Sequence, residues 1–431
     1  MELENFLFFI IPYSKNKEFI YFPMINKVYL NEKSDYSKNN IKKLFSQDLE
    51  KSKKIFETEF NSKKGYERKK IFPAGLVTIP NDNCNMRCTY CYARSNIGKE
   101  LNFEAYIAAV DYVVANYKSI GYIPNTFVGG GEPTYNFKLF KKMVEYFKEM
   151  VPLKKRWLEI TTNGLFNKEV CDYLLANFNQ INISFDGPPE VQNSQRPTVN
   201  NKPSFNIVYS NIKYIHKKLN KNQGILIQGT VNKNNLSKIN KIKDFFKQNL
   251  PGVECVIDGA FDLGRAKDNH NCSDKSIVFH SKYSDLRRLY PKKGFRRCAM
   301  YGLVLSITAS GKLTGCVHVS KPDDENYEHF IYGRYDDEKK KLVFDKNKLD
   351  YMKKRNVMNI SNCKNCFAKF DCGGSCPQKV LTSCGDDYDT SKYFFCQYER
   401  MYLIQRFCSA LNIPFNKNEM ISLLKNNITF K

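Results

Sequence analysis

The sequence predicts an α/β protein whose central part is a partial (β/α)6 TIM-like barrel, with a small leading α+β module and a cysteine-rich C-terminal domain. Three observations support this prediction. Short apolar segments alternate with amphipathic helical segments, glycines and polar residues follow the apolar segments, and cysteines gather in the last third of the chain. In a parallel arrangement of this kind, the chemistry is expected at the carboxyl ends of the strands.

Residues 1–70 are predicted to form the leading module. Apolar extended runs come first and polar helical stretches follow, which is the order of a small strand-then-helix unit. The expected strands are Phe6–Pro12, Phe19–Met24 and Lys27–Leu30, the helical part is Ser37–Phe60, and the polar segment Asn61–Lys70 is the expected linker.

Residues 71–265 are predicted to form the partial barrel. Its expected strands are Gly75–Pro80, Asn125–Gly129, Trp157–Thr162, Ile181–Phe185, Gly224–Val231 and Val253–Ala260. Helical apolar spacing lies between them, at Glu104–Tyr117, Phe137–Met150, Lys168–Phe178, Phe205–Leu219 and Leu236–Leu250. Residues 266–400 are then expected to form a domain organised by metal, and residues 401–431 a tail that begins with a helix.

Composition bounds the class of protein. A chain of 431 residues suggests two or three domains, and 42% hydrophobic residues are typical of a globular protein. Glu2 and Glu4 stand where a signal peptide would carry positive charge, and no apolar run approaches the length of a membrane span. We therefore expect a cytoplasmic protein, in which 15 cysteines indicate metal or redox chemistry.

The net charge of +24 could attract nucleic acid, an anionic membrane or an acidic polypeptide, or could simply be a lysine-rich solvated surface. A basic zinc protein that binds nucleic acid would have aromatic residues interleaved with the basic ones. That interleaving is not apparent, so we expect neither nucleic acid nor a membrane as a partner.

Three thiols at CxxxCxxC spacing directly follow the first expected barrel strand. Cys84, Cys88 and Cys91 are close enough in sequence to share one metal centre and leave one coordination position open. Both an iron–sulfur cluster and zinc suit thiolate ligands. The spacing of these cysteines alone leaves both open.

A glycine-rich turn follows the second expected strand. Gly130 and Gly131 allow the backbone to approach a ligand closely, and the carboxylate of Glu132 could accept hydrogen bonds from an amine. With Tyr90 before the last cysteine of the loop and the turn Ser184–Pro188 after the fourth strand, these motifs resemble the radical S-adenosylmethionine superfamily.

This resemblance implies a 4Fe–4S cluster on Cys84, Cys88 and Cys91, with S-adenosylmethionine chelated to its open iron. It further implies that Gly130, Gly131 and Glu132 position the methionyl amine, and that Ser184 and Arg196 contact the cofactor. One electron would then cleave the sulfonium and give a 5′-deoxyadenosyl radical that abstracts a hydrogen atom. A low-potential donor such as a flavodoxin or ferredoxin would supply the electron.

The C-terminal cysteines resemble a SPASM domain, whose seven positions are all filled here: Cys298, Cys316, Cys363, Cys366, Cys372, Cys376 and Cys396. The likeness implies two auxiliary 4Fe–4S clusters, and therefore three clusters in all. Its outer cluster would use Cys363, Cys366, Cys372 and Cys396, and its inner cluster Cys298, Cys316 and Cys376.

The inner cluster is one ligand short, because Lys292 stands where some relatives have an extra cysteine. Cys255, Cys272 and Cys384 are possible substitutes, and an open iron is the other possibility. The alternative for the whole region is a pair of zinc sites. Cys171 and Cys408 lie in helical patterns and are expected in the core, and His318 is a weak candidate for a catalytic base.

The resemblance implies an enzyme that modifies peptides or proteins. Sulfatase-maturing relatives carry an aspartate directly after the cysteine of the Gly-x4-Cys unit, whereas this chain has Val317. We therefore predict a maturase that abstracts a hydrogen atom from a ribosomally synthesised precursor and installs a thioether or carbon–carbon crosslink. The alternative is oxidation of Cys or Ser to formylglycine. The module 1–70 is expected to bind a leader peptide, which the basic surface would attract if it is acidic.

Overall fold

The computed structural model describes residues 7–32, 38–57, 72–94, 98–118, 121–260, 263–268, 277–280, 296–393, 395–416, 418 and 420–421. The chain divides into two compact units. The first contains residues 1–70, 285–299 and 353–431, and the second contains residues 71–284 and 300–352. No helix among the described residues combines the length and the apolar character that a membrane crossing needs.

The second unit is built on a parallel sheet. Its strands β4 to β9 are hydrogen-bonded in the order of the sequence, and every neighbouring pair is parallel. Their bounds are Leu76–Thr78, Ile123–Phe127, Arg156–Thr162, Gln180–Ser184, Gly224–Val231 and Glu254–Gly259. All six predicted strands are confirmed to within a few residues. Closure of the sheet into a partial barrel stays a prediction.

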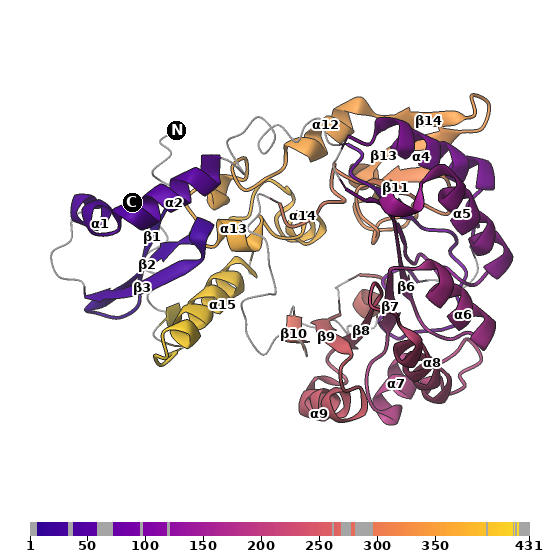
Figure 1. The fold of residues 1–431 in the computed structure, drawn as a ribbon, viewed down its shortest axis with the longest axis horizontal. Coiled ribbons are helices and arrows are strands. Elements are labelled where there is room, and N and C mark those ends of the chain that lie inside the picture. Colours follow the sequence, from indigo (N-terminus) through magenta and orange to yellow (C-terminus); the bar gives the residue numbers. More distant parts are fainter. Residues whose placement is uncertain are drawn as a thin grey trace. The chain divides into compact units, whose positions relative to one another are not determined.

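Helices connect these strands and lie along the outer side of the sheet (Figure 1). They are α4 (Phe103–Asn116), α5 (Phe137–Met150), α6 (Lys168–Asn177), α7 (Pro189–Gln195), α8 (Phe205–Lys218) and α9 (Ile239–Asn249), and a short helix, α10 (Gly264–Asp268), follows β9. Asparagine side chains cap α4, α5 and α6, each accepting a hydrogen bond from a backbone N–H of the first turn. In α5, Phe140, Met143, Val144 and Phe147 are buried, which is the spacing of one helix face.

Five further strands extend the sheet at both edges. Strand β10 (Ile277–His280) pairs with β9, and β11 (Leu305–Ile307), β12 (Lys312–Thr314), β13 (Ile331–Asp336) and β14 (Lys341–Phe344) continue from β4. β11 runs parallel to β4, with Leu305 opposite Leu76, whereas the other added strands are antiparallel. The short helices α11 (Tyr327–Phe330) and α12 (Lys346–Lys354) complete the segment. Cys316 therefore follows a strand of the same sheet that carries the CxxxCxxC loop.

The first unit begins with the predicted strand-then-helix module. An antiparallel sheet contains β1 (Phe9–Pro12), β2 (Lys17–Phe22) and β3 (Lys27–Glu32), followed by α1 (Lys38–Leu44) and α2 (Ser46–Ile55). Its C-terminal part contains α13 (Lys369–Cys372), α14 (Pro377–Cys384) and the tail helix α15 (Phe395–Ala410). Side chains of β1, β2 and α15 share one core, in which the Phe19 and Phe407 rings are 5.4 Å apart.

Candidate active site

The three thiols lie on one loop that leaves the carboxyl end of β4. Cys84, Cys88 and Cys91 are free and partly exposed. Burial, together with smaller effects of the Cys88 and Glu132 charges, raises the pKa of Cys84 to about 12. Burial also raises the pKa of Cys88 to about 11. A metal centre at these thiols would therefore have to displace protons, which couples its binding to pH.

Two backbone segments hold this loop from opposite sides. On one side, Gly131 N donates to Asn81 O at 2.9 Å and Glu132 N donates to Asn83 O at 2.7 Å. On the other side runs the segment Gln195–Val199, which we call the strap. Hydrogen bonds join it to the loop from Arg87 N to Pro197 O (2.8 Å), from Thr89 N to Gln195 O (2.9 Å) and from Val199 N to Asn85 O (3.1 Å).

The glycine-rich turn after β5 packs against the thiol loop. A Cβ atom on Gly131 would lie 1.9 Å from the carbonyl oxygen of Asn83, so only glycine fits there. A Cβ on Gly130 would lie 2.6 Å from Asp82 Oδ1. Tyr92, next to Cys91, donates from its hydroxyl to Gly129 O at 3.1 Å. The predicted cofactor-binding glycines thus lie directly against the predicted metal loop.

Glu132 is buried, with 2% of its surface exposed, and its carboxylate links the turn after β5 to the end of β6. Oε1 accepts from Thr162 Oγ1 at 2.6 Å and from Thr134 Oγ1 at 2.7 Å, and Oε2 accepts from Asn163 N at 2.7 Å. Burial raises the pKa of Glu132, and these hydrogen bonds oppose that shift. Glu132 is therefore a structural link. Its Oε2 atom still has capacity for a further donor, as the predicted contact with an amine requires.

Asn163, which the sequence did not single out as a ligand-site residue, reaches the thiol loop from the end of β6. Its amide nitrogen lies 3.7 Å from Cys84 Sγ and 2.7 Å from Asn85 Oδ1. The sequence feature that could have indicated Asn163 is its position directly after an expected strand and next to Gly164. Ser184, a predicted cofactor contact, is the last residue of β7 and is partly exposed.

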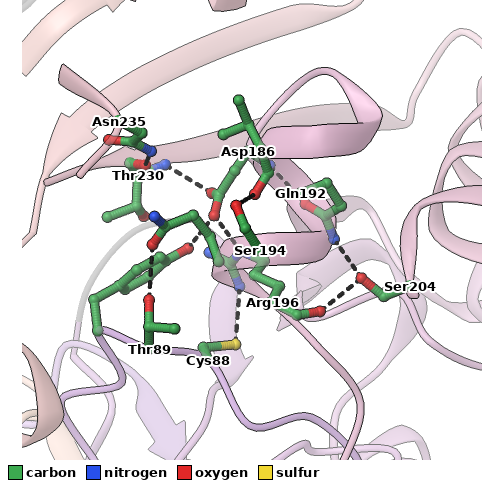
Figure 2. Close-up of polar contacts among 12 residues, drawn as sticks. Cys88, Thr89, Asp186, Gln192, Ser194, Arg196, Ser204, Thr230 and Asn235 are labelled. Carbon is green, nitrogen blue, oxygen red and sulfur yellow. Dashed lines mark hydrogen bonds and ion pairs between the residues drawn. The ribbon is translucent and has the colours of Figure 1, made fainter. Parts of the chain in front are cut away.

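A buried polar network surrounds Cys88 (Figure 2). Arg196 Nη1 lies 3.9 Å from Cys88 Sγ, and Arg196 Nε forms an ion pair with Asp186 Oδ2 at 3.1 Å. The Tyr90 hydroxyl donates to the same carboxylate oxygen at 2.6 Å. Sequence reasoning named Arg196 but missed Asp186, although Asp186 lies in the turn Ser184–Pro188 that carried the resemblance.

His318 lies beside the thiol loop. Its ring is 4.3 Å from that of Tyr92, and both residues line a cavity of about 340 Å³. Burial raises the pKa of Tyr92, and the neighbouring Cys91 and Cys316 thiols add to the shift, so Cys316 is also nearby. The remaining lining residues are Arg94, Leu263, Gly264, Lys267, Asp323, Asp324 and Glu325.

The four cysteines predicted for the outer auxiliary cluster lie near one another in the first unit. Burial raises the pKa of Cys363 to about 12, with contributions from Cys366 and Cys396, and it raises that of Cys372, with contributions from Glu399, Cys363 and Cys396. Positively charged side chains act in the opposite direction: Arg400 and Lys369 on Cys366, and Arg297 on Cys372. Four thiols with cations around them suit a cluster that carries negative charge.

The three cysteines predicted for the inner auxiliary cluster are divided between the two compact units. Cys298 and Cys376 belong to the first unit and Cys316 to the second. Among the proposed substitutes, Cys255 is buried in β9 with its thiol 3.7 Å from Val253 O, and Cys384 ends α14. Cys272 and Lys292 lie outside the described residues. Cys171 and Cys408 are buried, as predicted.

Among the described residues, no group of three or more His, Cys, Asp or Glu side chains is arranged to hold a single metal ion. A cluster places each thiolate on a different iron atom, so its ligands need not meet at one point. The loop of three thiols, with amide and guanidinium N–H groups directed at two of them, offers the donor set of such a cluster.

The parallel α/β fold and its CxxxCxxC loop define a class of enzymes that use a metal centre at the edge of a sheet. Residues 78–241 match the profile of the Radical SAM superfamily. This part of the chain is therefore a radical SAM domain, and the superfamily implies S-adenosylmethionine and a 4Fe–4S cluster. Cys84, Cys88 and Cys91 would hold the cluster.

Several known proteins resemble a larger part of the chain. The cysteine-type anaerobic sulfatase-maturating enzyme of Clostridium perfringens strain 13 is 23% identical, over 80% of this chain and 99% of its own length. The radical SAM cyclopropyl synthase TigE of Paramaledivibacter caminithermalis is 22% identical, over 87% of this chain and 83% of its own. Two further curated relatives align over only 44% and 47% of their lengths.

A solved structure described as native anSMEcpe with bound AdoMet shares the fold. It superimposes with a TM-score of 0.57 at 18% identity, covering 78% of this chain and 99% of its own. This likeness supports the α/β fold of the chain.

Proposed function

We propose that this radical SAM enzyme is a peptide maturase, which abstracts a hydrogen atom from a ribosomally synthesised precursor and closes a thioether or carbon–carbon crosslink. The observation that carries the proposal is the cavity between the thiol loop and the segment after Cys316, lined by Tyr92 and His318. A substrate held there would lie beside the source of the radical and beside a predicted auxiliary-cluster ligand.

The chain's own residues would bind the cofactor and position the substrate. Bound S-adenosylmethionine and its reduced cluster supply the abstraction of a hydrogen atom. The Gly129–Glu132 turn would hold the methionyl amine, and Ser184 and Arg196 are the other candidate contacts. His318 would accept the proton released as the ring closes. Auxiliary clusters on the C-terminal cysteines would accept the electron released as the ring closes, and a flavodoxin or ferredoxin would supply the electron that the cluster on the thiol loop needs.

Position 317 favours ring formation over formylglycine formation. In the sulfatase-maturing pattern an aspartate follows the cysteine at this position and serves as the base, and here the residue is Val317. A valine side chain can neither accept nor donate a proton. The relative TigE, described as a cyclopropyl synthase, shows that a homologous chain of similar extent forms carbon rings.

The second candidate function is oxidation of Cys or Ser to formylglycine. The observation in its favour is that the match to the Clostridium perfringens sulfatase-maturating enzyme covers 99% of that protein. The structure of anSMEcpe with the Cp18Cys peptide has a TM-score of 0.57, a likeness that extends to the fold alone.

A direct assay separates the two functions. The reconstituted enzyme would be incubated without oxygen with S-adenosylmethionine, dithionite and either a short peptide encoded next to its gene or a peptide with a sulfatase motif. With the precursor we expect 5′-deoxyadenosine and a peptide that has lost hydrogen but has kept its sulfur. With the sulfatase peptide we expect no such change. An aldehyde on the sulfatase peptide, detected with a hydrazide reagent, would instead establish the second function.

Binding of the precursor is measured separately. We propose that residues 1–70 contact the leader, and that a basic surface attracts it. Affinity should then fall as salt rises, because screening weakens attraction between separated charges. Affinity that does not change between low and physiological salt would rule out an acidic leader.

A further inference from the structure

Arg196 is placed to act on the metal centre itself. Its side chain is 7% exposed, and its Nη1 atom points at Cys88 Sγ at 3.9 Å. Cys88 is one of the three predicted cluster ligands, so this guanidinium faces a ligand sulfur. A buried N–H group directed at a thiolate forms a stronger hydrogen bond than the same group in water.

The guanidinium is fixed in this position by Asp186. The carboxylate is 1% exposed and forms the 3.1 Å ion pair with Arg196 Nε. Asp186 is itself held by the Tyr90 hydroxyl at 2.6 Å and by Thr230 N at 2.9 Å. The Tyr90 ring also lies under the guanidinium, with 5.1 Å between Arg196 Cζ and the ring centroid. Figure 2 shows Asp186 between Thr230 and Arg196, with Arg196 beside Cys88.

The backbone of Arg196 is fixed as well. Its carbonyl oxygen accepts from Ser204 Oγ at 2.7 Å, and Ser204 Oγ in turn accepts from Gln192 Nε2 at 3.0 Å. The neighbouring residues of the strap, Gln195 and Pro197, accept hydrogen bonds from Thr89 N and Arg87 N of the thiol loop. The guanidinium and the thiol therefore belong to one connected structure, and their separation is set by backbone hydrogen bonds.

We propose that Arg196 is a positioning residue for the metal centre: it donates a charge-assisted hydrogen bond to the Cys88 thiolate and raises the reduction potential of the bound cluster. Hydrogen bonds to the cysteine sulfurs of a cluster are one of the factors that set its potential. The reduced cluster carries one more negative charge, so a fixed cation favours it over the oxidised cluster.

The geometry of the ion pair agrees with this role. Arg196 Nη1 is directed at Cys88 Sγ at 3.9 Å, and the Asp186 carboxylate contacts the same guanidinium at Nε. The cation is therefore the member of the pair that contacts the sulfur, and Asp186 holds it in place.

The test is a redox titration followed by electron paramagnetic resonance on reconstituted full-length protein. The variants are R196Q, R196K and the control R265Q, and the triple variant C84A/C88A/C91A gives the background signal of any other centre. Arg265 of α10 is a suitable control because its Nη1 donates to the carbonyl oxygen of Cys88 at 3.3 Å. The R265Q substitution therefore removes the same charge from beside the same loop.

We expect the midpoint potential of R196Q to lie below that of the unmodified protein, with R196K between them and R265Q closer to the unmodified protein. If R196Q takes up no iron, the proposal is judged on R196K, whose midpoint potential should still lie below that of the unmodified protein. A full iron content with an unchanged midpoint would overturn the proposal, and weaker S-adenosylmethionine binding alone would make Arg196 a cofactor contact only. These readouts involve no peptide, so they are independent of the proposed substrate.

Discussion

Gly131 joins the glycine-rich turn to the thiol loop through a backbone contact that leaves no room for a side chain. A Cβ atom there would lie 1.9 Å from Asn83 O, one residue before Cys84. We expect G131A to displace the thiol loop at a cost of about 1–3 kcal/mol, as other overpacked sites do. Iron content after reconstitution should fall while the circular dichroism spectrum is retained. E132Q is the comparison, because it keeps the backbone contact; equal iron in G131A and in the unmodified protein would contradict the prediction.

A substitution at His318 can distinguish radical formation from ring closure. Its ring packs on Tyr92 at 4.3 Å, so H318F preserves an aromatic ring at that position and removes both nitrogen atoms. If His318 is the base, formation of crosslinked peptide should fall about 100-fold, which is typical of a lost general base. Cleavage of S-adenosylmethionine should continue. Product formation at an unchanged rate would exclude His318 as the base.

At the scale of single residues, the sequence indicated the candidate ligands more readily than their surroundings. Cysteines at fixed spacing are visible in a linear sequence, whereas the residues around them come from distant positions. Asn163 reaches Cys84 directly, Asp186 acts on Cys88 through Arg196, and the residue types of both are common after strands. Only the packing of β6 and β7 beside β4 and β5 shows which side chains lie near a thiol.

At the scale of elements, the parallel strands and their helices could be predicted because each has a local signal. In β8, buried and partly exposed residues alternate along the whole strand, and α5 buries one face. The added strands β11 and β12 have only three residues each, too few to show a period. The pairing of β11 with β4, at positions far apart in the sequence, has no local signal at all.

Asp48 joins the leading sheet to helix α2. It accepts from Lys27 Nζ at 2.8 Å and from Tyr29 OH at 2.5 Å, both on β3. Burial raises the pKa of Asp48, but these hydrogen bonds outweigh burial, so its pKa lies below the ordinary value. We expect D48N to lower the free energy of unfolding by about 1–3 kcal/mol near pH 7.

The pH dependence of this effect has a definite sign. Because the folded pKa is depressed, the unfolded chain binds more protons, so the stabilisation is present above the unfolded pKa of about 3.9 and is lost as pH falls through the folded value. Thermal unfolding at a series of pH values would show the two proteins converging in acid. K17A is the control, since the exposed Lys17–Glu32 pair at 3.6 Å should contribute little. A constant difference down to pH 3 would contradict the assignment.

At the scale of the whole molecule, residues 1–70 belong to the same compact unit as residues 353–431. Phe19 and Tyr21 of β2 pack against Phe407 of α15, at ring distances of 5.4 and 4.6 Å. Deleting residues 1–70 would therefore expose the core that also supports the C-terminal cysteines. A role in leader binding is better tested with surface substitutions on β3, the edge strand, than with a deletion.

The number of clusters follows from which cysteines act as a set. Cys363, Cys366, Cys372 and Cys396 influence one another electrostatically and are surrounded by Arg400, Lys369 and Arg297. With three clusters the protein should bind about 12 iron atoms, and C366A should retain about 8, because loss of one ligand of four weakens one cluster alone. Cleavage of S-adenosylmethionine should persist in C366A, since the thiol loop is intact.

C408A is the matched control for this experiment. Cys408 is buried in the core of the same unit, so its removal also costs packing but takes away no predicted ligand. Iron and sulfide analysis of the two variants would separate a lost ligand from a loosened core. A full iron content in C366A would show that the four thiols do not ligate one cluster. Equal losses of iron in C366A and C408A would show that metal binding depends on the packed core of the first unit and not on the Cys366 thiol.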